Sequence, residues 1–126
     1  MSDRYQQGLQ RLSEVDGEAG ERAVAEMAAR HPDLSRYIVE FAFGDVYSRP
    51  GLDLRSREIA TIAALTAMGN AMPQLKVHIA AALNVGLTET EIEEVILQMS
   101  VYAGFPAAMN AMTLAHEVFA EHAQGE

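Results

Sequence analysis

The sequence predicts an all-α protein, a single-domain helical bundle of about six or seven helices. Three observations favour this fold class. Apolar residues recur at helical spacing along the chain, without the alternation that marks strands. Several Gly and Pro residues fall where these periodic segments begin or end. The composition is rich in Ala, Leu and Met, and aromatic residues make up only 6% of the chain, with no Trp, which favours closely packed helices.

The first helices are expected before a loop near residue 50. Residues 3–15 and 18–30 show amphipathic spacing, and the pair Asp16-Gly17 separates them. Pro32 suits the first turn of a helix that runs to about Tyr47. The stretch SRPGL, residues 48–52, is predicted to be a loop because Pro-Gly favours a turn.

The next predicted helix is the most apolar one. Asp53 is a plausible N-cap, and the helix runs to about Met68. Residues 59–68 are apolar on nearly every side, so this helix is expected to be buried all round, either in the domain or between subunits. Gly69-Asn70 is expected to end it.

Three further boundaries organise the last helices. Pro73 opens one, and Gly86 is expected to end it as a left-handed C-cap. Thr88 and Glu91 fit a capping box for a helix that runs to Gly104. The last helix is expected from Pro106 to about His122.

Length, charge and composition exclude several classes of protein. The 126 residues suit one domain, 1–126, and the 49% of apolar residues suffices for a core. The net charge of −9 argues against nucleic acid and anionic membranes as partners. The absence of Cys excludes disulfides, thiolate metal sites and thiol catalysis. The polar first residues and the shortness of the longest apolar run, IATIAALTAM, lead us to expect a cytoplasmic protein.

The amount of buried-looking apolar surface suggests a homo-oligomer. A domain of this size cannot bury all of that surface by itself. No metal is expected, because nothing resembles a metal-binding motif, and the six-residue separation of His116 and His122 does not place them well on one helix face.

Three arginines lie close together in the sequence. Arg49, Arg55 and Arg57 fall within nine positions, on the predicted loop and the first turns of the apolar helix. They are either solvated surface residues paired with nearby acids or a clamp for a carboxylate, since guanidinium groups bind carboxylates through two parallel hydrogen bonds.

His78 and Glu58 are the other candidates for chemistry. His78 shares a helix face with Leu75 and Ala82, so it is either a packed structural histidine or a general acid or base. Glu58 enters the apolar stretch and is expected at the mouth of a cavity or, in the simpler alternative, paired with Arg55 or Arg57.

Three long stretches resemble the carboxymuconolactone decarboxylase family. They are FAFGDVYSRPGL, RSREIATIAALTAMG and QLKVHIAAALNVGLTETEIEEVILQMSVYAGFPAAMNAM. The start RYQQGLQRLSEVDG is similar as well, so the resemblance covers nearly the whole chain. Its most specific parts are the SRPGL loop, the lone His of LKVHIAAALN and the corner YAGFPAA.

The resemblance implies a fold, an assembly and a reaction. The fold is all-helical and alkyl hydroperoxidase D-like, and the assembly is a homo-oligomer, either a trimer or a hexamer. The reaction is decarboxylation of 4-carboxymuconolactone, a small anionic lactone, to the β-ketoadipate enol-lactone in protocatechuate catabolism, without a cofactor. Related peroxidases use a C-x-x-C motif. The positions of its two cysteines are occupied here by Ala71 and Gln74, which cannot do thiol chemistry, so thiol peroxidase activity is excluded.

The resemblance also implies roles for the candidate residues. The predicted catalytic residues are His78 and Arg57, and the predicted substrate-binding residues are Asp45, Arg49, Glu58, Tyr102 and Phe105. His78 would give a proton to the dienolate that remains after CO₂ leaves, and Arg57 or Tyr102 would stabilise its oxygen. Arg49 or Arg57 would clamp the carboxylate that stays. Tyr102 and Phe105, at the break between helices at Gly104, would line an apolar pocket for the carboxylate that leaves as CO₂.

Two departures from the family pattern leave alternatives open. Where the family is expected to read GEVWSRPG, this chain has Asp45 and Tyr47. A paralogue of the same fold that acts on another small anionic lactone or keto acid is therefore one alternative. A non-catalytic oligomer that binds a ligand is the other.

Overall fold

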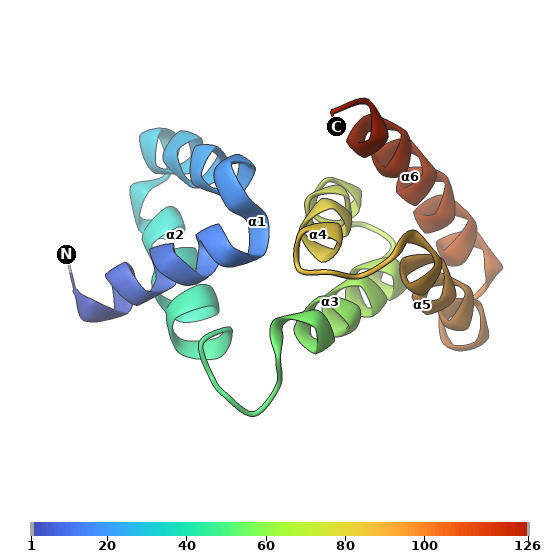
Figure 1. Cartoon of the computed structure of the whole chain (residues 1–126), viewed down its shortest axis with the longest axis horizontal. Helices are drawn as coiled ribbons and strands as arrows, with labels where there is room; N and C mark the ends of the chain where they lie inside the picture. Colours follow the sequence, from blue (N-terminus) through green and yellow to red (C-terminus); the bar gives the residue numbers. More distant parts are fainter. Residues whose placement is uncertain (1, 126) are drawn as a thin grey trace. The chain divides into compact units, whose positions relative to one another are not determined.

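A computed structural model describes residues 2–125 of the chain, and it is helical throughout (Figure 1). The elements are α1 (Asp3–Arg30), α2 (Pro32–Tyr37), the π-helix η1 (Ile38–Val46), α3 (Leu54–Met68), α4 (Met72–Asn84), α5 (Glu89–Tyr102) and α6 (Phe105–Gln124). No strand occurs among residues 2–125. The all-α prediction, with six or seven helices, is therefore confirmed. Within the same residues, no helix is both long and apolar enough to cross a membrane.

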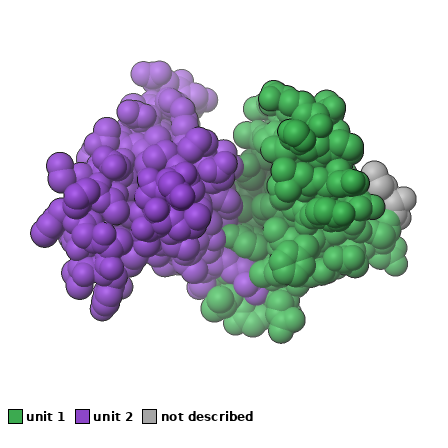
Figure 2. Space-filling view, turned by 180° about the vertical axis from the view of Figure 1, so that it is seen from behind, with its two compact units in different colours: residues 1–54 green, residues 55–126 purple. Residues whose placement is uncertain are grey.

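The chain divides into two compact units, which are described separately (Figure 2). Unit 1 is Met1–Leu54 and holds α1, α2 and η1. Unit 2 is Arg55–Glu126 and holds the four helices that follow. The assignment of residues 1–126 to one domain stays a prediction.

The predicted break at Asp16-Gly17 is present in unit 1. Gly17 has φ 62° and ψ −149°, so α1 is two helices joined at a kink. The first of them is capped by Ser2, whose hydroxyl oxygen accepts a hydrogen bond from the Tyr5 amide at 3.1 Å.

Two glycines allow α1 and η1 to approach closely. A Cβ on Gly8 would lie 1.9 Å from the carbonyl oxygen of Val39, and one on Gly44 would lie 2.6 Å from that of Arg4. No side chain fits at either distance, so each helix presents a glycine to the backbone of the other. The apolar side chains buried in this unit are Leu12, Val15, Val39 and Phe43.

The predicted helix from Pro32 to Tyr47 changes its hydrogen-bonding pattern on the way. It is an α-helix to Tyr37 and a π-helix over Ile38–Val46. At its end the Tyr47 amide donates to the carbonyl of Ala42, five residues back, at 2.8 Å. Such i→i+5 helices are rare and often occur at functional sites. The residues that follow form the predicted SRPGL loop.

In unit 2, four helices surround one apolar cluster. The cluster takes Ile62 from α3, Ile92 and Ile96 from α5, and several residues each from α4 and α6, among them Leu75 and Ile79. Alanines 108, 111 and 115 line one side of α6, which lets that helix pack closely.

The predicted ends of these helices are largely confirmed. Gly86 has φ 102°, in the left-handed region, where α4 gives way to the next helix. The capping box is complete: the Thr88 hydroxyl accepts from the Glu91 amide at 3.0 Å, and the Glu91 carboxylate accepts from the Thr88 amide at 2.9 Å. The last helix begins at Phe105, one residue before Pro106.

Of the two alternatives for burying α3 all round, burial within the domain is wrong, and burial between subunits stays a prediction. Only Glu58, Ile62 and Thr66 are fully buried, at i, i+4 and i+8 along one face. Met68 at its end is 60% exposed. Small alanines on the other faces made the sequence look uniformly apolar, although short side chains have little surface that needs to be buried.

Candidate active site

The central feature of unit 2 is a carboxylate–imidazole pair between α3 and α4. Nδ1 of His78 lies 2.9 Å from Oε2 of Glu58. The Glu58 side chain is 0% exposed and that of His78 is 22% exposed. The pair therefore has a buried end, the carboxylate, and an end that solvent reaches, the imidazole.

The helices place both residues by simple periodicity. Glu58 begins the buried face of α3, one turn before Ile62. His78 lies next to Ile79 and one turn after Leu75, both fully buried in α4. A buried carboxylate needs a hydrogen-bond donor, and the imidazole on the neighbouring helix supplies one.

The pair fixes which ring nitrogen of His78 is available for chemistry. Because a carboxylate only accepts, Nδ1 carries a proton and donates it to Glu58. The other nitrogen, Nε2, has no hydrogen-bond partner among residues 2–125. It can accept a proton when the ring is neutral and donate one when the ring is charged.

The arginines of the predicted clamp lie in different settings. Arg55 forms an ion pair with Glu91 at 2.6 Å, and this pair, together with the capping hydrogen bond from Thr88, lowers the pKa of the Glu91 carboxyl. Glu58 has His78 as a partner, and the alternative pairing of Glu58 with Arg55 or Arg57 stays a prediction. Arg57 is partly buried on α3, directly before Glu58, and its role stays a prediction.

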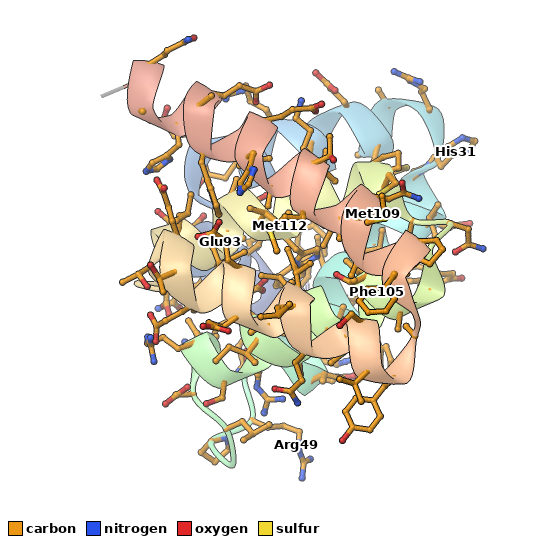
Figure 3. The ribbon with its side chains drawn as sticks, turned by 90° about the vertical axis from the view of Figure 1, so that its right-hand side faces the viewer. His31, Arg49, Glu93, Phe105, Met109 and Met112 are labelled. Carbon is orange, nitrogen blue, oxygen red and sulfur yellow. The ribbon has the colours of Figure 1, made fainter. Side chains whose placement is uncertain are left out.

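Tyr102 and Phe105 lie on the outside of unit 2. They are 77% and 70% exposed, on either side of Gly104, whose φ is 99°. Phe105 and Met109 project from the first turns of α6 in Figure 3. A pocket that these aromatics line would be open to solvent in this chain, so their predicted role in binding substrate stays a prediction.

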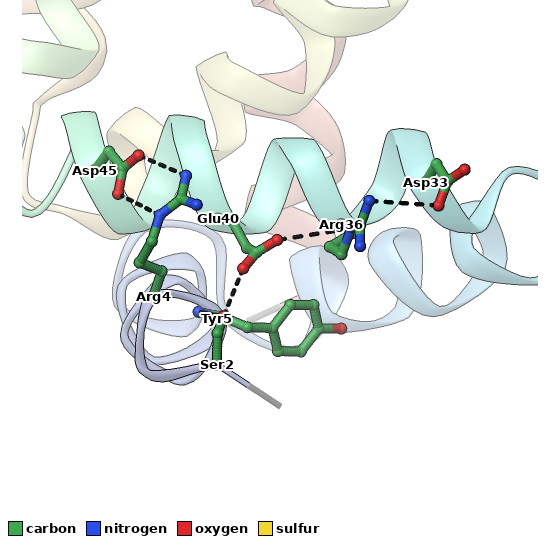
Figure 4. A network of polar contacts seen from close by, with 7 residues as sticks. All are labelled: Ser2, Arg4, Tyr5, Asp33, Arg36, Glu40 and Asp45. Atoms are coloured by element: carbon green, nitrogen blue, oxygen red, sulfur yellow. Dashed lines mark hydrogen bonds and ion pairs between the residues drawn. The ribbon is translucent and has the colours of Figure 1, made fainter.

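Asp45, in unit 1, is engaged by an arginine that the sequence analysis did not single out. Its carboxylate accepts two hydrogen bonds from Arg4, at 2.7 and 3.0 Å (Figure 4). These hydrogen bonds lower the pKa of Asp45 and raise that of Arg4. The pair fastens η1 to α1, and a contact between Asp45 and substrate stays a prediction.

Arg49 lies in the loop after η1, where Figure 3 shows its side chain extending outward. It lines a hollow of ≈ 360 Å³ in unit 1, together with Arg11, Tyr47 and Ser48. Sequence reasoning missed Arg11, because nothing in the local pattern of α1 separates it from other surface arginines. Across residues 2–125, no three side chains from His, Asp and Glu form a metal-binding group.

The fold and this pair define a small all-helical protein that holds a buried carboxylate against an accessible imidazole. The chain belongs to the carboxymuconolactone decarboxylase family, whose sequence profile matches residues 32–117. The matched range includes Glu58 and His78, and it excludes Arg11.

Individual relatives agree with this assignment. The chain is 43% identical over 117 residues to 4-carboxymuconolactone decarboxylase of Acinetobacter baylyi. The aligned region covers 92% of this chain and 87% of the relative. It is 41% identical over 91 residues to an uncharacterized protein of Paracoccus denitrificans, covering 71% and 68%. It is 40% identical over 75 residues to nitrosuccinic acid decarboxylase of Metarhizium robertsii, covering 60% and 52%.

Proposed function

We propose that this protein is a cofactor-free decarboxylase that converts 4-carboxymuconolactone into the β-ketoadipate enol-lactone. The observation that carries the proposal is the Glu58–His78 pair, an accessible imidazole held by a buried carboxylate. The similarity to a 4-carboxymuconolactone decarboxylase over most of the chain supports the choice of substrate. The chain has no Cys, so it cannot run a thiol peroxidase reaction.

The substrate supplies its own electron sink. The bond between the ring carbon and the leaving carboxylate breaks, CO₂ departs, and the electron pair moves through the double bond onto the lactone carbonyl. The product of this step is a dienolate, so neither a metal nor an organic cofactor is needed to hold the charge. What the protein must supply is stabilisation of the oxygen and a proton for carbon.

His78 would supply that proton. With Nδ1 donating to Glu58, the charged ring gives its Nε2 proton to the carbon α to the carbonyl and forms the C–H bond of the enol-lactone. The neutral ring then takes a proton from solvent, so each turnover consumes one proton. Glu58 acts as a positioning residue, because its hydrogen bond to Nδ1 orients the ring. Arg57 and Tyr102 are the two candidates for stabilising the dienolate oxygen.

The proposal includes a homo-oligomer in the cytoplasm. A band of large apolar side chains on α5 and α6 is exposed, and a partner subunit of the same chain would cover it. These side chains are Leu97, Val101, Tyr102, Phe105 and Met109, each at least 56% exposed. Exposed apolar patches of this kind mark protein interfaces.

A second candidate is the decarboxylation of a different small carboxylate. The similarity to nitrosuccinic acid decarboxylase, though it covers only 60% of this chain, supports this alternative. Asp45 and Tyr47, the departures from the expected family pattern, support it as well. A non-catalytic ligand-binding oligomer is the third reading.

Turnover of 4-carboxymuconolactone by the purified protein tests these readings. CO₂ release and loss of the lactone are followed for the wild type, His78→Ala, Glu58→Gln and the control His122→Ala, whose side chain is exposed near the end of α6. We expect His78→Ala to lower kcat by about 10²–10⁴-fold and Glu58→Gln by roughly 10–100-fold, with the control unchanged.

Each other outcome has a distinct meaning. Full turnover by a folded His78→Ala variant would remove His78 as the proton donor while leaving the reaction in place. A folded wild type that releases no CO₂ from this lactone would reject the named reaction. Nitrosuccinate then becomes the next substrate to assay, and inactivity with both would favour the non-catalytic reading.

A further inference from the structure

Two polar groups, at the end of α3 and just before α4, have no hydrogen-bond partner among residues 2–125. The first is the hydroxyl of Thr66, a residue that is 0% exposed and whose Oγ1 is out of reach of solvent. The second is the backbone amide of Ala71, a residue that is 7% exposed. The carbonyl of Ala71 accepts from the Leu75 amide at 2.9 Å, whereas its N–H has no acceptor in the same range.

The Thr66 hydroxyl departs from the usual behaviour of a threonine within a helix. A helical threonine can donate to the carbonyl four residues back. Thr61, five positions earlier in α3, donates in this way to the Arg57 carbonyl at 2.8 Å. Thr66 makes no such bond to the carbonyl of Ile62, so its hydroxyl is available to a partner outside its own helix.

Both groups belong to the region where α3 and α4 meet. Thr66 shares the buried face of α3 with Glu58, and Glu58 contacts His78 of α4. Residues 69–71 link the two helices, so the end of this face leads back to the start of α4. Ala71 is the N-cap of α4, and its methyl group cannot cap the helix. The first amides of a helix have no acceptor within it, so an outside oxygen is needed there.

Water matches the chemistry of the two groups. A buried hydroxyl or amide without a hydrogen bond loses its hydration and gains nothing in exchange. Internal water molecules in folded proteins typically bind to such groups, with about three hydrogen bonds each. A water oxygen accepts from the Ala71 amide, and the Thr66 hydroxyl can either donate to water or accept from it.

We propose that one internal water molecule is bound between the end of α3 and the N-terminus of α4. Oγ1 of Thr66 and the amide of Ala71 are two of its ligands. The water joins the two helices that carry Glu58 and His78, across the turn at Gly69. The inference does not depend on the proposed function, because no substrate takes part in it.

Crystal structures of the wild type and of Thr66→Val test for this water directly. We expect a water in the wild type at about 2.5–3.2 Å from both Oγ1 of Thr66 and the Ala71 nitrogen. Thr66→Val keeps the shape of the side chain and lacks the hydroxyl, so the water should be lost. Thr61→Val is the matched control and should keep it, because the Thr61 hydroxyl donates to its own helix.

Two crystallographic results would overturn the site. One is a well-ordered wild-type map without a water at this place. The other is a water that stays in Thr66→Val. If Thr66→Val does not fold, Thr66→Ser, which keeps the hydroxyl, must retain the water, and its loss there would count against the site in the same way.

Urea unfolding adds a test in which the direction of the change decides. With the water bound, Thr66→Val removes one of its ligands, and the equilibrium constant for unfolding should rise by roughly 5–30-fold. A hydroxyl without any partner would instead make Thr66→Val more stable than the wild type, because an unsatisfied buried group is removed. An unchanged or smaller constant for unfolding would therefore overturn the proposal.

Discussion

The two units pack their helices in opposite ways. In unit 1, α1 and η1 meet at two glycines, Gly8 and Gly44, where no side chain separates the two backbones. In unit 2, the helices meet through a filled cluster of Ile, Leu and Ala side chains. The interface of unit 1 depends on the close approach of two backbones, and that of unit 2 depends on the volume of its buried side chains. Adding a side chain should therefore destabilise unit 1, and shortening a side chain should destabilise unit 2.

The units also treat their carboxylates differently. In unit 1, Asp45 meets Arg4 at the surface, and the partly buried Glu40 contacts Arg36 and Ser2 beside this pair (Figure 4). In unit 2, Glu58 is fully buried against His78. Burying a carboxylate is costly, and a catalytic role for the pair would explain why this sequence retains it. Exposed pairs contribute little to stability, so the Arg4–Asp45 pair mainly sets how α1 and η1 are arranged.

The largest loss of stability is expected from removing volume in unit 2. Ile79 is 0% exposed within the apolar cluster, so Ile79→Ala should lower the free energy of unfolding by about 2–5 kcal/mol, through lost burial and the cavity left behind. Urea unfolding at one fixed protein concentration measures it. The control is Val77→Ala, 43% exposed on the same helix, which should change stability by no more than about 0.5 kcal/mol. An equal loss of unfolding free energy in Ile79→Ala and Val77→Ala would contradict the conclusion that unit 2 is stabilised by the volume of its buried side chains.

A smaller loss is expected from adding volume in unit 1. In an open helix, Gly→Ala stabilises by roughly 0.5–1 kcal/mol, but the new Cβ at position 8 would lie 1.9 Å from the Val39 carbonyl oxygen. Gly8→Ala should therefore destabilise by about 1–3 kcal/mol. The sign of the change is itself the test.

Gly51→Ala is the matched control, because a Cβ at position 51 meets nothing within 4 Å. Hydrogen exchange adds the location: Gly8→Ala should lower protection in α1 and η1, and Ile79→Ala in α4, α5 and α6. A stabilised Gly8→Ala variant would show that the α1–η1 crossing is not tight.

The features that the sequence predicted correctly are those that depend on residues close together in the chain. The kink at Gly17, the left-handed Gly86 and the Thr88–Glu91 capping box each depend on residues at most a few positions apart. The apolar pattern around them singled out His78 and Glu58 as candidates, and the family resemblance implied their roles. Their hydrogen bond joins residues 20 positions apart and depends on how α3 and α4 pack, which no short pattern encodes.

The features that sequence reasoning missed are long-range for the same reason. Arg4 reaches Asp45 across 41 positions, and Arg11 reaches Ser48 across 37. The π-helix was missed because its sequence, IVEFAFGDV, has the apolar spacing of an ordinary helix. Within this π-helix, Gly44 packs against the backbone of α1, a contact that the spacing of apolar residues does not reveal.

The smallest expected effect is a difference in pH dependence between two surface ion pairs, one in each unit. Arg4 lowers the pKa of Asp45 in the folded protein, and Arg55 does the same for Glu91. An unfolded chain then binds more protons than the folded one as pH falls, so stability falls with it. Each contribution is fully present above the ordinary carboxyl pKa of about 4 and is lost as pH drops through the lowered value.

Asp45→Asn and Glu91→Gln should each remove one of these contributions. The stability difference between wild type and variant should be largest near neutral pH and shrink toward pH 3. Because Gln can still complete a capping box, Glu91→Gln removes the charge and keeps the cap. Hydrogen exchange, followed from neutral pH into the acid range, should show a weaker acid dependence in unit 1 for Asp45→Asn and in unit 2 for Glu91→Gln. If either variant changed both units equally, the two regions would respond as one cooperative body, and their different packing would not divide their stability.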